Sequence, residues 1–169
     1  MFDLTNKVCL VTGATRGIGQ AIAKQLGAQG AIVVGTATSQ GGADSISADL
    51  ASAGITGAGR VLNVTNGDSV DELIKSITEE FGAINVLVNN AGITRDNLMM
   101  RMKEEEWDDI MSTNLKSVYR LSKGVLRGMM KARTGRIINI TSVVGVSGCL
   151  LYTSPSPRDQ RGSRMPSSA

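Results

Sequence analysis

The chain has 169 residues, of which 41% are hydrophobic and 20% charged, a composition typical of one soluble globular domain with a sizeable core. It contains no histidine and two cysteines, which excludes histidine-dependent triads, makes a zinc site implausible and predicts no disulfide framework. We expect no signal peptide and no membrane span, and therefore a reducing cytoplasmic location.

The net charge of +3 is unevenly distributed. The last 21 residues carry three arginines and one aspartate, so residues 1–148 keep a charge of only +1. Because this main part shows no basic stripe, we expect no nucleic-acid partner and no membrane partner.

Residues 1–148 alternate short apolar runs with helical patterns, which predicts an α/β fold with a doubly wound parallel sheet. The runs are continuous rather than alternating, as expected of parallel strands covered on both faces. The predicted strands are Lys7–Val11, Ala31–Gly35, Ala58–Leu62, Asn85–Asn89 and Arg136–Ile140. The predicted helices are Gly17–Gln29, Gly41–Ala53, Ser69–Phe81 with Asn66 as N-cap, and a long segment from Lys103 to Lys131.

A glycine-rich segment, Thr12–Gly19, joins the first predicted strand to the first predicted helix. Glycines let the backbone turn tightly and approach a ligand, and the helix then points its free N–H groups at a phosphate. The segment therefore predicts dinucleotide binding, with an ordinary turn as the alternative.

The second predicted strand ends in Gly35–Ser39, which contains no Asp or Glu to bind a ribose 2′-hydroxyl. Together with Arg16 in the glycine-rich segment, this favours NADP over NAD as the cofactor. The alternative is that Arg16 is merely solvated. Asn89-Asn90-Ala91-Gly92 closes the fourth strand, either as a simple turn or at the edge where ligands bind in such sheets.

Four motifs together resemble the short-chain dehydrogenase/reductase family in order and spacing. They are Thr-Gly-x-x-x-Gly-x-Gly at 12–19, Asn-Asn-Ala-Gly at 89–92, Asn114 in the long helix, and Ser142 after the fifth strand. Within the family, Gly13–Gly19, Gly35–Ser39 and the run from Ala91 to Trp107 look like the bacterial members that reduce 3-oxoacyl-[acyl-carrier-protein] in fatty acid synthesis. The resemblance covers residues 1 to about 148 and implies an NADP-binding Rossmann domain there.

The resemblance also implies a role for each matching residue. The cofactor phosphates would lie against Gly13, Ala14, Thr15 and Arg16, with Gly17, Ile18 and Gly19 completing the glycine-rich segment. Thr38 would contact the adenosine end, and the adenine and ribose pocket would be lined by Asn63, Val64 and Asn90. No metal is implied.

Two further residues are implied as catalytic. Ser142 would hydrogen-bond the substrate carbonyl and stabilise developing negative charge on its oxygen. Asn114 would bend its helix and hold a water for proton relay. Without the other motifs, the simpler interpretations are that Ser142 is a capping serine after a strand and that Asn114 is an ordinary polar residue inside a helix.

The family's proton donor is a Tyr thirteen residues after the Ser, with a Lys four residues further on to lower the pKa of the phenol. Here those positions hold Pro155 and Asp159, and neither residue can do this. Tyr119 and Lys123 have the right spacing, but they precede Ser142 inside the long helix and are interpreted as a chance match. We expect the chain as written to be inactive.

Residues 149–169 form a second segment that contains all three prolines and five serines of its own, which predicts a disordered tail. Residues 149–159 and 163–169 look like the two ends of a transposase-type sequencing adapter translated in frame. Our hypothesis is that a reductase gene was joined to library DNA after Gly148, with an ordinary flexible tail as the alternative. The strand at Arg136–Ile140 would then be an apolar edge and an aggregation hazard.

The resemblance implies acyl carrier protein as partner and a homotetramer in which Lys103–Lys131 supplies part of the interface. Arg127, Lys131 and Arg133 would meet the acidic carrier, unless they are a solvated helix end. Two other functions stay open: a short-chain reductase of another small carbonyl or alcohol, and a non-catalytic NADP-binding module.

Overall fold

The computed structural model describes residues 3–142, and in them five parallel strands form one sheet in the order β3-β2-β1-β4-β5. The strands are β1 (Val8–Val11), β2 (Ile32–Ala37), β3 (Gly57–Val61), β4 (Ile84–Asn89) and β5 (Arg136–Asn139). The strand order reverses between β1 and β4, so the doubly wound Rossmann sheet predicted from the sequence is confirmed.

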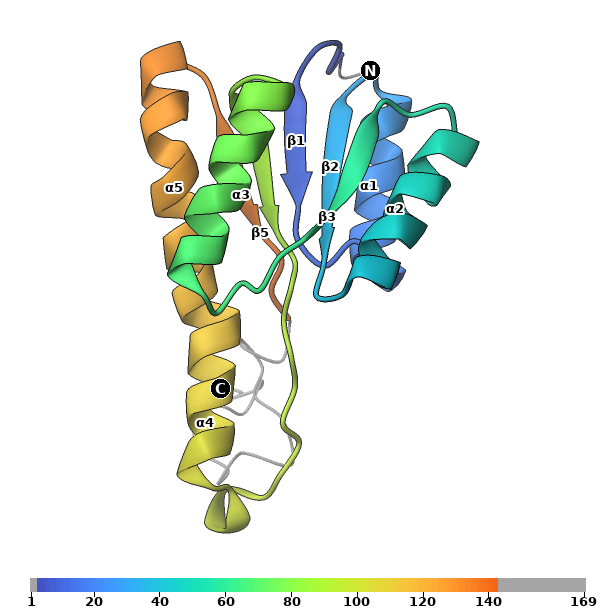
Figure 1. The fold of residues 1–169 in the computed structure, drawn as a ribbon. Coiled ribbons are helices and arrows are strands. Elements are labelled where there is room, and N and C mark those ends of the chain that lie inside the picture. The colour runs from blue at the N-terminus through green and yellow to red at the C-terminus, as the bar shows by residue number, and fades with distance from the viewer. Residues whose placement is uncertain (1–2, 143–169) are drawn as a thin grey trace, which may run out of the picture.

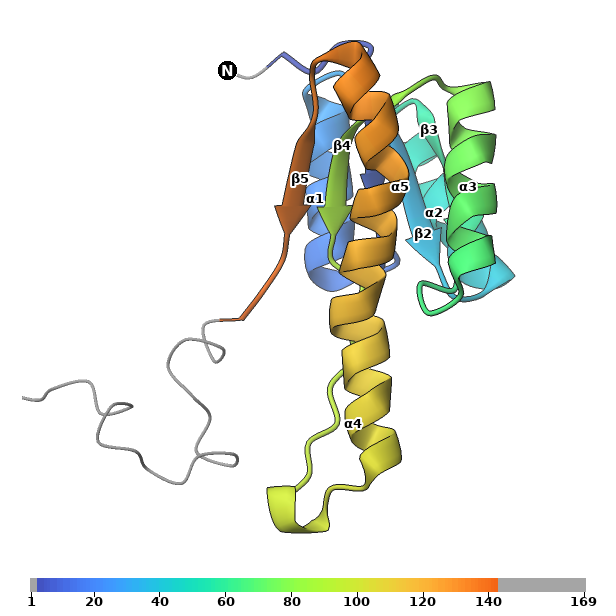
Figure 2. The same cartoon turned by 90° about the vertical axis from the view of Figure 1, so that its left-hand side faces the viewer.

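Helices cover both faces of this sheet (Figure 1). They are α1 (Gly17–Ala28), α2 (Gln40–Ser52), α3 (Gly67–Glu80), α4 (Glu104–Ile110) and α5 (Ser117–Ala132). Figure 2 shows α1 and α2 on one face and α3 and α5 on the other, with α4 extending past the carboxyl ends of the strands.

The core has two halves, because each strand sends alternate side chains to opposite faces. On the α1 and α2 face, Cys9 and Val11 of β1 pack with Ile46 and Leu50 of α2. On the other face, Leu10 and Leu87 pack with the apolar sides of α3 and α5. Strands buried on both faces explain why the apolar runs of the sequence are continuous.

Element boundaries differ from the predicted ones by one or two residues. Asn66 is the N-cap of α3 as expected, and its side-chain oxygen accepts hydrogen bonds from the backbone N–H groups of Asp68 and Ser69 at 2.9 and 3.3 Å. The long predicted helix is less regular than its sequence pattern. A six-residue π-helical segment, Met111–Lys116, separates α4 from α5, and a short 3₁₀ turn precedes them at Met99–Arg101.

In the described part of the chain, β5 pairs with β4 alone and forms one edge of the sheet. Residues 143–169, which include the predicted tail, lie outside the described residues. None of the helices between residues 3 and 142 has the length and apolar character needed to cross a lipid bilayer.

Candidate functional site

A cleft of about 440 Å³ lies at the carboxyl ends of the strands, beside the point where the strand order reverses. Ligands bind at this place in open α/β sheets. The cleft brings together six of the predicted cofactor residues: Gly13, Thr15, Arg16, Thr38, Val64 and Asn90. Its other lining residues are Thr36, Ala37, Ser39, Leu62, Ala91, Gly92, Ile93 and Thr113.

The glycine-rich segment is fixed by Asn90 and Thr12. The Asn90 side-chain amide donates to the carbonyl oxygens of Thr12 and Gly13 at 2.9 and 3.0 Å. The Thr12 hydroxyl accepts hydrogen bonds from the backbone N–H groups of Asn90 and Ala91, both at 2.9 Å. This network explains why the sequence contains both motifs, because the Asn-Asn-Ala-Gly segment fixes the backbone of the glycine-rich segment by hydrogen bonds.

The third glycine of the glycine-rich segment, Gly19, is required because its backbone lies very close to Gly13 and Asn90. A Cβ at Gly19 would lie 2.2 Å from the Gly13 carbonyl oxygen and 2.5 Å from the Asn90 amide nitrogen. Gly13 itself has a φ of +65°, which favours glycine. Gly17, Ile18 and Gly19 do not line the cleft and instead form the first turn of α1.

The N-terminus of α1 differs from those of α2 and α3. Ser39 caps α2 and Asn66 caps α3 with their side-chain oxygens, whereas Arg16 places no side chain on the first-turn N–H groups of α1. Because Arg16 and Gly13 line the cleft, the uncapped end of α1 lies beside it. A phosphate is the ligand that such a helix end stabilises, so the cleft fits a dinucleotide.

The side of the cleft at the end of β2 carries hydroxyl groups and no carboxylate. Thr36 is buried and its hydroxyl accepts a hydrogen bond from the Gly13 N–H at 3.3 Å. Thr38 and Ser39 are exposed, and Arg16 lines the same cleft. Hydroxyls and a guanidinium suit a ribose 2′-phosphate, which an Asp or Glu would repel.

The connection between β3 and α3 supplies the remaining wall through Leu62 and Val64. Asn63 does not line the cleft, because its side chain turns back: its oxygen accepts hydrogen bonds from the Thr65 N–H and hydroxyl at 3.0 and 2.7 Å. Ala14 is also buried away from the cleft, and its N–H donates to the Thr36 carbonyl at 2.9 Å. The direct contacts predicted for Asn63 and Ala14 stay predictions.

Asn114 lies in the π-helical segment and binds the chain that follows the Asn-Asn-Ala-Gly motif. Its amide nitrogen donates to the Ile93 carbonyl and its oxygen accepts from the Ile93 N–H, each at 2.8 Å. This pair of bonds brings Ile93 and Thr113 to the cleft, a long-range effect that local sequence patterns do not signal.

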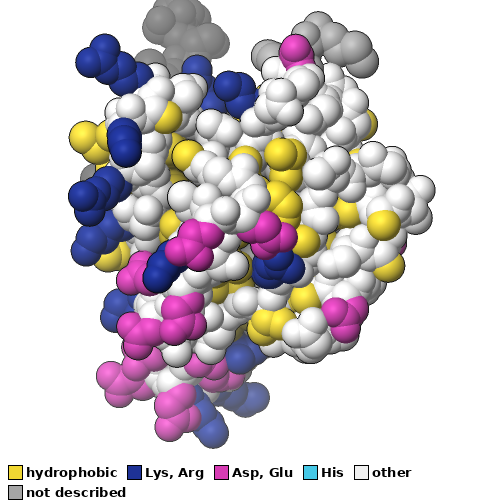
Figure 3. Space-filling model, turned by 45° about the horizontal axis from the view of Figure 1, so that its top comes forward, with side chains coloured by type: hydrophobic (Ala, Val, Ile, Leu, Met, Phe, Trp, Pro, Cys, Tyr) yellow, Lys and Arg dark blue, Asp and Glu magenta, His cyan; other side chains and the backbone are white. Residues whose placement is uncertain are grey.

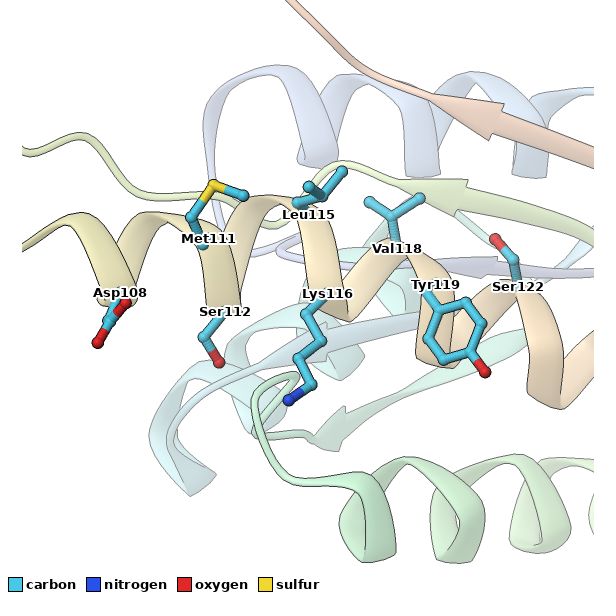
Figure 4. A pocket seen from close by; sticks show the side chains of 8 residues that line it. All are labelled: Asp108, Met111, Ser112, Leu115, Lys116, Val118, Tyr119 and Ser122. Atoms are coloured by element: carbon cyan, nitrogen blue, oxygen red, sulfur yellow. The ribbon is translucent and has the colours of Figure 1, made fainter.

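Ser142 follows β5 at the same carboxyl edge and is exposed. The end of β5 is tied to β4, since the Asn89 side-chain amide donates to the Asn139 oxygen at 2.8 Å. Pro155 and Asp159 lie outside the described residues. Tyr119 does not reach the cleft: it lines a separate hollow on the outer side of α4 and α5, where Figure 4 shows it beside Lys116 and Ser122. The interpretation of Tyr119 and Lys123 as a chance match stays a prediction.

In the described residues no group of three or more Asp, Glu, Cys or His side chains is placed to hold a metal ion. Cys9 is a free, fully buried thiol, and burial raises its pKa from an ordinary 9.0 to about 11.

These features together define a dinucleotide-binding protein. They are a parallel doubly wound sheet, a glycine-rich turn held by the Asn90 side chain, and an uncapped N-terminus of α1. The family model for short chain dehydrogenases matches residues 7–154, and the chain belongs to that family.

Among curated proteins, the chain is similar to reductases described as 3-oxoacyl-[acyl-carrier-protein] reductase FabG. It is 64% identical to that of Vibrio cholerae over 146 residues, 62% identical to that of Haemophilus influenzae over 145, and 61% identical to that of Escherichia coli K12 over 146. Each alignment covers 86% of this chain and 59% of the relative, so the chain spans about three fifths of the length of these relatives.

Proposed function

We propose that the chain is the cofactor-binding part of an NADPH-dependent reductase that converts 3-oxoacyl-[acyl-carrier-protein] to the 3-hydroxyacyl form. The cleft is the observation that supports NADPH as the cofactor. The uncapped N-terminus of α1 lies beside it, and Arg16, Thr38 and Ser39 line it. The substrate class is supported by the identity to reductases that act, by their names, on acyl carrier protein. A reducing cytoplasm is the proposed location, consistent with the free thiol of Cys9.

NADPH, when bound, supplies the hydride for the keto carbon. The glycine-rich segment would hold its phosphates, and Arg16 and Thr38 would bind its 2′-phosphate. Ser142 donates a hydrogen bond to the keto oxygen and stabilises the negative charge that develops there. Asn114 fixes the chain at Ile93 beside the substrate and belongs to the proposed proton relay.

The proton for the alcohol needs a donor that this chain does not place at the family's position, because Pro155 and Asp159 stand there. We therefore propose that this chain binds NADPH without turnover. The alternative function is reduction of another small carbonyl compound. It would use the same residues of this chain and would differ only in the substrate.

The experiment compares this chain with a chimera in which residues 149–169 are replaced by the corresponding C-terminal part of the Vibrio cholerae relative. NADPH and NADH binding is followed by fluorescence, and NADPH oxidation at 340 nm with 3-oxoacyl-[acyl-carrier-protein] and with small free ketones. We expect both proteins to prefer NADPH and only the chimera to oxidise it, with the carrier-bound substrate. Absence of NADPH binding in both would overturn the proposal, and activity on free ketones alone would favour the other reductase.

The long helical unit from α4 to α5 supports the proposed homotetramer. Its outer side exposes apolar side chains around the hollow in Figure 4, including Leu115 at 59% and Tyr119 at 62% exposure. Acidic residues gather at its α4 end and cations along α5, as Figure 3 shows for one face of the molecule. Two such helices packed antiparallel would pair opposite charges and bury the apolar side.

Arg127 and Lys131 of α5 and Arg133 just after it remain the proposed contact for the acidic carrier protein. All three are exposed, in the last two turns of α5 or directly after it, and Figure 1 shows that this end of α5 lies away from α4. A charge-reversing change at Arg133 should weaken carrier binding by the chimera without affecting NADPH binding.

A further inference from the structure

One loop of the cofactor cleft depends on a helix that does not itself line the cleft. The loop runs from Leu62 to Asn66, between β3 and α3, and contributes the side chains of Leu62 and Val64 to the wall. Figure 1 shows this connection crossing below the carboxyl ends of the strands before it enters α3. Its position relative to the sheet therefore sets the width of the cleft at this wall.

The loop is held by one buried side chain and by two local hydrogen-bonded turns. Val64 is buried with Leu121 in the core, which anchors the side-chain end. Asn63 closes a local turn on Thr65, and Asn66 caps α3. These local turns fix the shape of the loop, and the Val64 side chain holds it in the core beside α5, but neither bonds the loop backbone directly to that helix.

A direct bond between the loop backbone and α5 comes from Arg120. Its guanidinium Nη1 donates a hydrogen bond to the Thr65 carbonyl oxygen at 2.6 Å, across 55 residues of sequence. A Cβ built on Gly67 would lie 3.9 Å from the Arg120 Nε, so the side chain also lies against the first residue of α3. A hydrogen bond from a charged donor is stronger than one between neutral groups, and it joins α5 directly to the loop.

We propose that Arg120 is a positioning residue for the cofactor: it fixes the loop Leu62–Asn66 against α5 and so sets the pocket for the adenosine end. This inference rests on the proposed function, because it concerns the same cleft. Arg120 is itself absent from the cleft lining and acts through the Thr65 carbonyl. Its loss therefore weakens contacts with the adenosine end and leaves the contacts with the nicotinamide end unchanged.

The test uses the full 169-residue chain and three substitutions at one position. Arg120→Met keeps the aliphatic stem over Gly67 but removes the donor, Arg120→Lys keeps a cationic donor, and Arg120→Ala removes both. Lys123→Ala is the matched control, since Lys123 is an exposed cation one turn further along α5. The probes are NADPH, adenosine 2′,5′-bisphosphate and reduced nicotinamide mononucleotide, with affinities measured by calorimetry or fluorescence.

We expect Arg120→Met to weaken NADPH and adenosine 2′,5′-bisphosphate by the same factor, about tenfold, which is the effect of losing one charged hydrogen bond. Binding of the nicotinamide mononucleotide should stay within about twofold, and Arg120→Lys should restore most of the lost affinity. In the ligand-free chain, Arg120→Met should also speed amide hydrogen exchange in residues 63–66 and leave it unchanged at Gly13–Gly19.

Unchanged affinity for adenosine 2′,5′-bisphosphate in Arg120→Met overturns the inference while the proposed function stands. An equal loss for all three probes, with a lowered melting temperature and no rescue by Lys, also overturns it, because Arg120 would then serve stability alone. If the unsubstituted chain binds neither NADPH nor adenosine 2′,5′-bisphosphate, the proposed function itself fails.

Discussion

Asn114 and Ile93 exchange two hydrogen bonds of 2.8 Å, so that one side-chain amide replaces the backbone partner that Ile93 would have in a strand. The π-helical segment makes this possible, because a helix widened at Met111–Lys116 presents Asn114 toward the chain that leaves β4. A Cβ at Gly92 would lie 3.2 Å from the Asn114 oxygen, so the neighbouring glycine leaves room for the pair.

The Asn114 pair predicts separate effects for two substitutions. Asn114→Leu removes both bonds and should lower the free energy of unfolding by about 1–2 kcal/mol. Asn114→Asp keeps the acceptor for the Ile93 N–H and loses only the donor. Amide hydrogen exchange checks this: the Ile93 amide should exchange at least tenfold faster in Asn114→Leu and stay protected in Asn114→Asp. Full protection of Ile93 in Asn114→Leu would contradict the assignment.

Gly19 is predicted to tolerate no side chain. In Gly19→Ala the new methyl group would collide with the Gly13 carbonyl, which is backbone and held by Asn90, so the glycine-rich segment must move. We expect a loss of about 1–3 kcal/mol in stability and of most NADPH binding. Gly41→Ala is the control, since a Cβ there meets nothing within 4 Å in the first turn of α2. Thermal melts and NADPH titrations of both variants give the comparison.

The sheet and the glycine-rich segment could be predicted because their signals are local. Continuous apolar runs mark buried parallel strands, and a strand followed by spaced glycines marks the phosphate turn. Even the least regular strand, Gly57–Val61, was found within one residue from the alternation of elements, although only Ala58 and Val61 supply its apolar side chains.

The rest of the site could not be predicted in this way because it depends on contacts distant in sequence. Thr113 and Ile93 reach the cleft through the Asn114 pair, 21 residues apart, and Arg120 meets Thr65 across 55. Asn63 differs from these residues, because its contact is local. The cofactor contact that the resemblance implies for Asn63 stays a prediction, and its side-chain oxygen accepts hydrogen bonds from Thr65 in a turn that the sequence Asn-Val-Thr makes available.

Thr38 is predicted to set the preference for NADPH. In Thr38→Asp a carboxylate would stand on the cleft wall where a 2′-phosphate is expected, and it would instead accept a hydrogen bond from an unphosphorylated ribose. NADPH affinity should fall at least about tenfold, while NADH affinity stays equal or rises. Thr38→Asn has a similar shape without the charge and is the control for packing. Equal losses for both cofactors in Thr38→Asp would show that Thr38 does not face the 2′-position.

In the described residues β5 is an edge strand, and this edge is predicted to drive self-association. Ile138 is 44% exposed and lies beside a hollow of about 740 Å³ lined by Leu4, Leu26 and Val86. A lysine on an edge strand opposes pairing with another edge, so Ile138→Lys should raise the concentration at which light scattering detects aggregates. Val61→Lys, equally exposed at 44% on the other edge strand, is the control and should have less effect because the ion pair of Arg60 with Glu80 already makes that edge polar.

Cys9 predicts a loss of stability in alkaline solution. Its thiol is fully buried, and burial raises its pKa from 9.0 to about 11, so folding opposes formation of the thiolate. Below pH 9 the thiol is neutral in both the folded and the unfolded chain, and the full stability is present. Between pH 9 and 11 the unfolded chain ionises first, so the free energy of unfolding falls by about 1.4 kcal/mol per pH unit from this group.

Urea denaturation of the unsubstituted chain and of Cys9→Ala from pH 7 to 11 measures this effect as a difference in slope. Cys9→Ala lowers stability at every pH because it removes buried volume, but its curve should decline less steeply above pH 9. Cys149 and the tyrosines and lysines are present in both proteins, and their titration therefore cancels in the difference. Parallel curves across this range would mean that the Cys9 thiol ionises in the folded protein as readily as in the unfolded one.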